Sequence, residues 1–213
     1  MQNTGGTLEY WLKKLEKKQD QEFSEDDETP YKGPDKIISG GQTGADRAGL
    51  EVARRLGIRT GGTCAPGYVT TSGKDISLSS FGVTPLLYSG SVSGGYVKRS
   101  MKNVDNADAT IAFRTHSSLG TDKTIGYCVS GRWKKISIEM GPSGTWTDSA
   151  NHPVIVIDIS QTMSDFKAQD AIREFLKKHR VRVLNVAGHR ERNGFQAKVV
   201  AFLFETLSEK WGY

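Results

Sequence analysis

The sequence predicts an α/β protein with a mostly parallel sheet and helices on its faces. From residue 36 onward, short apolar stretches typical of strands alternate with longer stretches in which apolar residues recur at helical spacing. This alternation is expected of parallel strands joined by crossover helices. The continuous β-branched run PVIVIDI at 153–159 adds to the prediction, because a strand covered on both faces needs no polar side. We interpret it as a central strand.

The N-terminal segment differs in composition and is predicted to be an extension of the main domain. Leu8, Trp11, Leu12 and Leu15 recur at helical spacing, and an acidic stretch that ends at Pro34 follows them. Such a stretch is typical of a solvated linker. We therefore predict an N-terminal helix and acidic linker over residues 1–34 and one α/β domain over residues 35–213, which is long enough to bury a sizeable core.

The elements of the α/β domain are expected in a regular order. A strand at 36–39 precedes a helix whose small apolar residues, from Ala45 to Leu56, form one narrow face. A strand at 58–65 follows, and the stretch at 66–95 has no sustained period, which predicts a long loop. The remaining elements are expected as a helix at 95–107, a strand at 109–114, a helix that opens in a corner at 115–124, an edge strand at 134–140, a loop at 141–152, the strand at 153–159, a helix at 165–179, a strand at 181–188 and a helix at 193–211.

The charge distribution favours an anionic ligand. Residues 1–35 carry nine acidic and five basic side chains, whereas the rest of the chain carries 24 basic and 15 acidic ones. No apolar run reaches the roughly 20 residues that span a bilayer, and the N-terminus has no secretory apolar region, so we expect a cytoplasmic protein. Cys64 and Cys128 lie far apart outside any CxxC pattern, so no disulfide framework and no protein-bound metal site is predicted.

Residues 39–47, SGGQTGADR, connect a predicted strand to a predicted helix through a glycine-rich corner. Gly40 and Gly41 let a ligand approach the backbone closely, and Gly44 permits tight packing of the helix on the strand. The N–H groups at the start of the helix attract anions. Arg47 in the first helical turn opposes the helix dipole, which is easier to explain if an anion binds there.

The same corner also has a purely structural interpretation and excludes two familiar nucleotide sites. Thr43 can cap the helix with Asp46 three residues on, as in a capping box. A P-loop requires GxxxxGK[ST], which the sequence lacks. A GxGxxG corner would need glycine at Ser39 and a carboxylate about 20 residues further on, where RTGGTC stands.

Two further corners resemble the first in composition. In THSSLGTDKT at 115–124, Gly120 gives flexibility, Thr121 and Thr124 give hydroxyl groups, and Lys123 again places a cation near a helix N-terminus. NVAGHRERNG at 185–194 forms the third corner. Because the carboxyl ends of parallel strands meet at one edge of a sheet, we predict that the three corners form one phosphate-binding crevice.

Five strings in this order, SGGQTGADRAGL, GIRTGG, NVDNADATIAF, GTDKT and RVLNVAG, resemble the molybdenum-cofactor carrier family. That family belongs to a Rossmann-like superfamily that also contains the cytokinin-activating phosphoribohydrolases. The resemblance covers residues 36–213, and GGQTGxDRA is its most specific part. It implies a doubly wound, Rossmann-like α/β domain, commonly oligomeric, with molybdenum cofactor (molybdopterin) or, failing that, a nucleotide over the first corner.

The resemblance also implies which residues form the site. It matches Gly40, Gly41, Gln42, Thr43, Gly44, Asp46 and Arg47 in the first corner, the paired glycines Gly61 and Gly62, Asn103 and Asp108 before a strand, Gly120, Thr121 and Thr124 in the second corner, and Asn185 and Gly188 in the third. The chain departs from the family in its N-terminal extension, in its loop at 141–152 and in His189, where the family usually has proline. Thr124 stands where the related hydrolases carry the glutamate of GGxGTxxE, which disfavours their mechanism here.

The favoured hypothesis is a protein that binds a phosphate-bearing small molecule, as a molybdenum-cofactor carrier or a nucleotide-binding protein. In this hypothesis the amides of 40–44 and 120–124 hold phosphate, Arg47 and Lys123 supply charge, and Gln42 and Asn185 orient the ligand. A hydrolase that uses Asp46 or Asp122 as general acid/base is the first alternative. A nucleic-acid or protein interaction module ranks last, because no aromatic residues alternate with basic ones along an element. We expect a homo-oligomer and no association with membranes.

Overall fold

A computed structural model describes residues 30–137, 145–147, 151–160 and 166–208. Residues 32–211 fall in one compact unit. The predicted N-terminal helix lies outside the described residues, so the proposed domain boundary stays a prediction. No helix in the part of the chain that the structure describes is long and apolar enough to cross a membrane.

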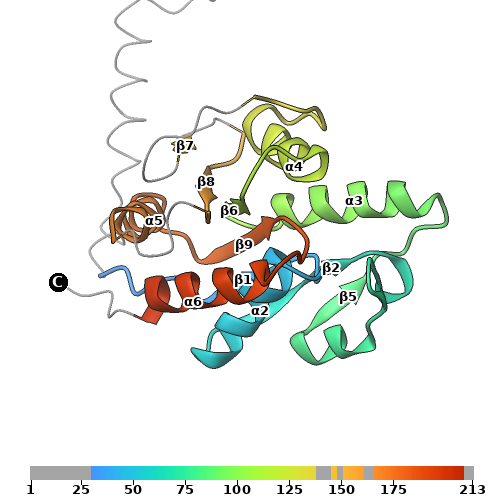
Figure 1. The fold of residues 1–213 in the computed structure, drawn as a ribbon, viewed down its shortest axis with the longest axis horizontal. Coiled ribbons are helices and arrows are strands. Elements are labelled where there is room, and N and C mark those ends of the chain that lie inside the picture. The colour runs from blue at the N-terminus through green and yellow to red at the C-terminus, as the bar shows by residue number, and fades with distance from the viewer. Residues whose placement is uncertain (1–29, 138–144, 148–150, 161–165, 209–213) are drawn as a thin grey trace, which may run out of the picture. The chain divides into compact units, whose positions relative to one another are not determined.

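The described residues form a seven-stranded sheet in the order β5-β2-β1-β9-β6-β8-β7 (Figure 1). Every neighbouring pair is parallel except β7 and β8, which are antiparallel. The strands are β1 (Lys36–Ile38), β2 (Arg59–Cys64), β5 (Val83–Pro85), β6 (Ala109–Arg114), β7 (Thr145–Thr147), β8 (Val154–Asp158) and β9 (Val183–Gly188).

Helices cover both faces of this sheet, which confirms the predicted doubly wound, Rossmann-like class. On one face α2 (Ala45–Arg55) packs against α6 (Phe195–Ser208), and α5 (Phe166–Lys178) packs against α6. On the other face lie α3 (Val92–Asp105) and α4 (Leu119–Ser130), which contact each other (Figure 1). Small residues let α2 lie close to the sheet: a Cβ at Gly49 would stand 2.6 Å from Cβ of Val186.

The stretch at 66–95 is not the long loop that we predicted. It contains the hairpin β3 (Val69–Thr70) and β4 (Gly73–Lys74), the 3-10 helix η3 (Ile76–Phe81) and the sheet strand β5. Leu78, Phe81 and Val83 are buried against Leu50 and Cys64, so side-chain burial holds the segment on the sheet. A strand of three residues is too short to show a period of two, which explains why the pattern missed it.

The far side of the sheet also differs from the prediction. Residues 134–137 of the predicted edge strand are not in a strand, and 138–140 lie outside the described residues. The edge strand is β7, inside the predicted loop at 141–152. The apolar run at 153–159 forms β8, whose first four residues are buried but which stands next to this edge, and β9 occupies the centre instead.

A buried polar network joins β9, β6 and His152, which lies two residues before β8. Asn185 Nδ2 donates to Thr110 Oγ1 at 3.1 Å, and Thr110 Oγ1 lies 2.9 Å from His152 Nε2. Asn185 and His152 are only 2 % and 6 % exposed. Burial lowers the pKa of His152 to about 4, since the charged ring would lose its hydration.

This network predicts a loss of stability in mild acid. The folded pKa of His152 lies below the unfolded value of 6.5, so its contribution is complete above pH 6.5 and is lost as the pH falls toward 4. Between pH 7 and pH 5 we expect a loss of about 2 kcal/mol from this residue. Urea unfolding at several pH values measures it, and His152→Gln should flatten the acid slope; an unchanged slope would show that His152 is already exposed or charged.

Candidate functional site

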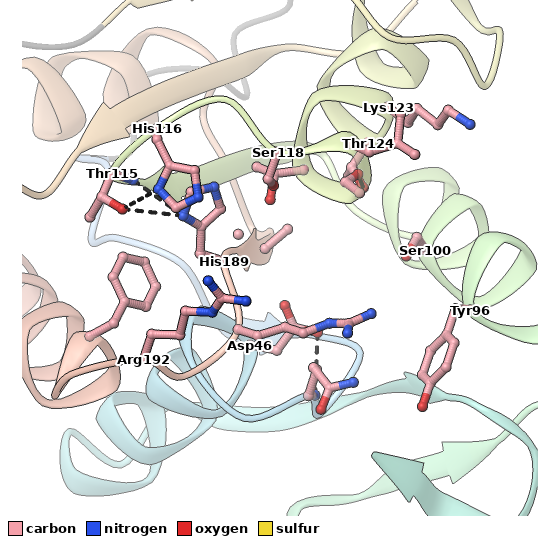
Figure 2. Close-up of a pocket in the computed structure, with 18 of the residues that line it drawn as sticks. Asp46, Tyr96, Ser100, Thr115, His116, Ser118, Lys123, Thr124, His189 and Arg192 are labelled. Carbon is pink, nitrogen blue, oxygen red and sulfur yellow. Dashed lines mark hydrogen bonds between the residues drawn. The ribbon is translucent and has the colours of Figure 1, made fainter. Parts of the chain in front are cut away.

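A pocket of about 870 Å³ opens where β1, β9 and β6 end, which are neighbours in the sheet (Figure 2). Its lining comes from the corners after these three strands and from one side of α3. The basic side chains that line it are Arg99, Lys123, Arg190, Arg192 and Lys198. Among the described residues Asp46 is the single carboxylate of this lining, so the pocket is strongly cationic.

The N-terminus of α4 is open toward a ligand. Its N-cap Ser118 makes no side-chain cap, and in the described part of the chain the amides of Leu119, Gly120 and Thr121 have no acceptor. All four of these residues line the pocket. An uncapped helix N-terminus carries both unused N–H donors and the positive end of the dipole, so it is suited to an anion.

A buried ion pair holds this second corner in place. Arg114 at the end of β6 donates from Nη1 to Oδ1 of Asp122 at 3.1 Å, and the two side chains are 8 % and 1 % exposed. Ser117 Oγ donates to the other carboxylate oxygen at 2.5 Å. Thr124 Oγ1 donates to the carbonyl oxygen of Gly120 at 3.1 Å. Asp122 therefore has a structural role and does not line the pocket.

The first corner is not open in the same way, which corrects the prediction for four of its five amides, those of 41–44. Gly41 N–H donates to Ser39 Oγ, and Gln42 N–H donates to Asp46 Oδ2. The N–H groups of Thr43 and Gly44 donate to side-chain oxygens of Gln42 and Gln196. Protein acceptors thus already take up these donors, and Gly44 with its φ of 102° replaces Thr43 as the N-cap.

Arg47 points away from the pocket, contrary to the predicted role. Its Nη2 donates to Ser77 Oγ at 2.8 Å and lies 3.4 Å from Oδ2 of Asp75, and its guanidinium lies over the ring of Phe81. Glu51 is 3.8 Å away on the same helix. These partners explain a cation in the first turn of α2 without any ligand.

Arg99 of α3 is a residue that sequence reasoning missed. Its Nη1 donates to Asp46 Oδ2 at 2.8 Å, and its guanidinium covers Gly40, where a Cβ would stand 1.4 Å from it. A side chain at position 40 would therefore displace this guanidinium from its place beside Asp46. No local pattern marks Arg99, because its partner is 53 residues away in the sequence.

The third corner contributes side chains, although its helix is capped. Gly188, His189 and Arg190 line the pocket. Glu191 accepts hydrogen bonds from the N–H groups of Gly194 and Gln196 at 2.8 and 2.6 Å and so caps α6. Of the helices that begin at the three corners, α4 alone has all of its first three amides free within the described residues.

Four residues that the family resemblance placed at the site support the backbone. Asn103 donates to the carbonyl oxygen of Thr63 and accepts from its N–H, and Asp108 accepts from the N–H groups of Arg182 and Val183. Gly62 has a φ of 126° and lies against Ser39, and Asn185 belongs to the buried network. The predicted site residues that do line the pocket are Gln42, Asp46, Gly120, Thr121, Lys123, Thr124 and Gly188.

The doubly wound sheet with a cationic pocket at its carboxyl edge defines a Rossmann-like α/β protein. The chain belongs to the circularly permutated YpsA SLOG family, whose model matches residues 37–147. The position of β9 agrees with that description: if β9 and α6 preceded β1, the parallel strands would follow one another outward from the middle of the sheet in each direction.

A solved structure resembles most of the chain. It is the crystal structure of "Putative molybdenum carrier protein" from Syntrophus aciditrophicus, with 25 % identity and a TM-score of 0.65, and the match covers 84 % of this chain and 97 % of that one. The two comparisons confirm the family that the motifs indicated. No curated protein matches the chain. In the part of the chain that the structure describes, no group of three or more His, Cys, Asp or Glu side chains is placed to hold a metal ion.

Proposed function

We propose that this protein binds a phosphate-bearing small molecule in the pocket, as a molybdenum-cofactor carrier does. The observation that carries the proposal is the uncapped N-terminus of α4 in a pocket lined by five basic side chains and one carboxylate. Unused amide donors, a helix dipole and cations together favour an oxyanion.

The donors of Gln42 add to this preference. Its Oε1 accepts from the N–H of Thr43 and from both the N–H and the hydroxyl of Thr71, at 3.0 to 3.2 Å. An amide nitrogen cannot accept a hydrogen bond, so the Gln42 atom that faces the two backbone N–H groups must be its oxygen. The NH₂ group of Gln42 is therefore the part of the side chain that can donate to a ligand. The pocket therefore offers mainly donors, which suits a ligand rich in acceptors.

The size and lining of the pocket suit a phosphate joined to a flat heterocycle. Its volume of about 870 Å³ lies in the range of sites for cofactor-sized ligands. Tyr96 and Trp133, both half-buried, line it as well and offer ring faces for stacking. Molybdenum cofactor, a phosphate-bearing pterin, has these two parts, and so has a nucleotide. The similarity to the molybdenum carrier structure favours the former as cargo.

The proposal predicts that Lys123→Ala weakens the binding of inorganic pyrophosphate by roughly 5- to 30-fold, since a charge-assisted contact at a half-exposed site contributes about 1–2 kcal/mol. Isothermal titration calorimetry measures the affinity. Lys102→Ala is the matched control, because Lys102 lies exposed on α3 outside the pocket lining. If the two variants bind equally well, the pocket is not the phosphate site.

Mass spectrometry of gently purified protein, together with its molybdenum content, identifies the cargo. A pterin with molybdenum would support the carrier function, and a nucleotide would point to the other ligand class. Release of free base from a nucleotide panel, abolished in Asp46→Asn, would instead indicate a hydrolase. Asp46 is the one candidate carboxylate in the lining, but Arg99 already binds it. The homo-oligomer and the cytoplasmic setting stay predictions.

A further inference from the structure

Asp46 has one carboxylate oxygen that is accessible and has no partner within the described residues. The residue lines the pocket, and its side chain is 5 % exposed. Its Oδ2 accepts from the Gln42 N–H at 3.4 Å and from Nη1 of Arg99 at 2.8 Å. Its Oδ1 accepts from no described residue, yet it is not one of the fully buried atoms that lack a partner. Oδ1 is therefore an acceptor that keeps accessible surface at the pocket.

Gln42 contributes a donor from the same corner. It is 6 % exposed and lines the pocket, and Oε1 is the atom of its side chain that binds Thr43 and Thr71. Within the described residues its NH₂ group has no acceptor, and it too is not one of the fully buried atoms. The bond from the Gln42 N–H to Asp46 joins the two residues. The first corner thus presents one acceptor and one donor to a ligand.

These two groups lie away from the open N-terminus of α4. Asp46 follows β1 and α4 follows β6, and β9 lies between these two strands in the sheet. Two strand spacings amount to roughly 10 Å. Figure 2 draws Asp46 on the opposite side of the pocket from Ser118 and Thr124. When a phosphate binds at the start of α4, the part of the ligand that reaches Asp46 is therefore the far edge of its heterocycle.

A carboxylate oxygen only accepts hydrogen bonds, so it selects an edge of donors. Adenine and cytosine place their amino group beside a ring nitrogen with a lone pair, which a carboxylate would repel. Guanine and pterins share a 2-amino-4-oxopyrimidine ring, in which the amino group stands beside a ring N–H and the oxo group follows. The donors of this edge match Asp46, and its oxo group matches the NH₂ of Gln42.

We propose that Asp46 and Gln42 recognise a 2-amino-4-oxopyrimidine edge, with Oδ1 of Asp46 accepting from its amino group and the NH₂ of Gln42 donating to its oxo group. This inference rests on the proposed function and narrows it, because molybdopterin and guanine nucleotides carry that edge and other common nucleotides do not. Asp46 is then a specificity-determining residue, and its buried pair with Arg99 fixes the orientation of the carboxylate.

Three nucleotides test the inference on wild-type protein by isothermal titration calorimetry. Guanosine, inosine and xanthosine diphosphate differ only at position 2 of the base, which carries an amino group, a hydrogen or an oxo group. We expect the guanosine compound to bind roughly 10- to 100-fold more tightly than the inosine compound, which lacks the charge-assisted bond. The xanthosine compound should bind most weakly, because its oxo group faces a carboxylate. Equal affinities for the three would overturn the inference, and no variant has to fold for this result.

Asp46→Asn should reverse the preference. The N–H groups of Gln42 and Arg99 both need an oxygen, so the asparagine oxygen takes the place of Oδ2 and its NH₂ group takes the place of Oδ1. We expect this variant to bind xanthosine diphosphate more tightly than guanosine diphosphate. A merely structural role would lower both affinities and leave their order unchanged, which would contradict the inference. Asp105→Asn is the matched control, since Asp105 is exposed on α3 outside the pocket lining, and it should keep the wild-type order.

A pterin probe distinguishes the two sources of this edge. 6-Hydroxymethylpterin diphosphate carries the same edge and the same diphosphate as guanosine diphosphate. Tighter binding of the pterin would identify a pterin ligand, and tighter binding of the nucleotide would identify a guanine nucleotide. Either result supports the inference, provided that Asp46→Asn lowers the affinity of that ligand relative to pyrophosphate. If the relative affinity stays the same, the inference is wrong.

The outcomes also separate this inference from the function on which it rests. If pyrophosphate binds and Lys123→Ala weakens its binding, but the three nucleotides bind equally well, the pocket holds phosphate and Asp46 does not read the base. If Lys123→Ala leaves the binding of pyrophosphate unchanged, the proposed function is wrong and the inference is wrong with it.

Discussion

Gly44→Ala is expected to destabilise the protein by roughly 3–5 kcal/mol. Gly44 has a φ of 102°, and a Cβ built on it would stand 2.3 Å from the carbonyl oxygen of His189 and 2.6 Å from the carbonyl carbon of Arg190. Both are backbone atoms, which cannot turn aside as a flexible side chain can. The strained backbone and the steric overlap therefore act together.

The overlap would also separate the first and third corners. Ala45 N–H donates to the His189 carbonyl oxygen at 3.0 Å, and Glu191 N–H donates to the Thr43 carbonyl oxygen at 3.1 Å. Moving the His189 backbone would strain both bonds, so we expect Gly44→Ala to weaken pyrophosphate binding as well as folding.

Gly57→Ala is the matched control for this prediction. Gly57 has a φ of 72°, but no atom lies within 4 Å of the added Cβ, so only the backbone preference is lost, about 1–2 kcal/mol. Urea unfolding of both variants measures the difference. Equal losses in the two variants would show that the contact between the first and third corners can relax.

The parts of the fold that local patterns specify could be predicted from the sequence. The apolar runs that became β8 and β9 and the small-residue face of α2 are local features, and the structure places strands and a helix there. The strand order was not predictable, because nothing local shows that β9 inserts between β1 and β6. The short strands β5 and β7 depend on their neighbours rather than on a period of their own.

The site shows the same limit. Local reasoning found the second corner, whose lining residues lie within one strand-to-helix connection. Local reasoning assigned Arg47 to a ligand because, within its own helix, only the dipole that opposes a cation is visible. The carboxylate beside Arg47 belongs to Asp75, in a distant segment of the sequence. Gln196, which takes up the Gly44 amide, is 152 residues away. Such partners become visible only when the chain is folded.

Asp122→Asn is expected to cost roughly 3–5 kcal/mol, because it removes the carboxylate that pairs with the buried Arg114 guanidinium. The two groups are 3.1 Å apart and their side chains are only 8 % and 1 % exposed, so water cannot reach the Arg114 guanidinium to compensate for the lost negative charge. Ser117 also loses a charged acceptor. Since Ser117 and Ser118 lead directly into the open end of α4, we expect pyrophosphate affinity to fall as well.

Asp35→Asn provides the control for the loss of a carboxylate. Asp35 pairs with Arg182 at 2.6 Å, but these side chains are 43 % and 68 % exposed, so we expect a change within about 0.5 kcal/mol.

The double variant Arg114→Met with Asp122→Leu should recover much of the stability, because it removes both buried charges together. It should not recover pyrophosphate binding if the ion pair serves to hold the α4 corner in its binding conformation. Urea unfolding and calorimetry on the three variants separate these two roles, and a cost for Asp122→Asn no larger than for Asp35→Asn would refute the structural one.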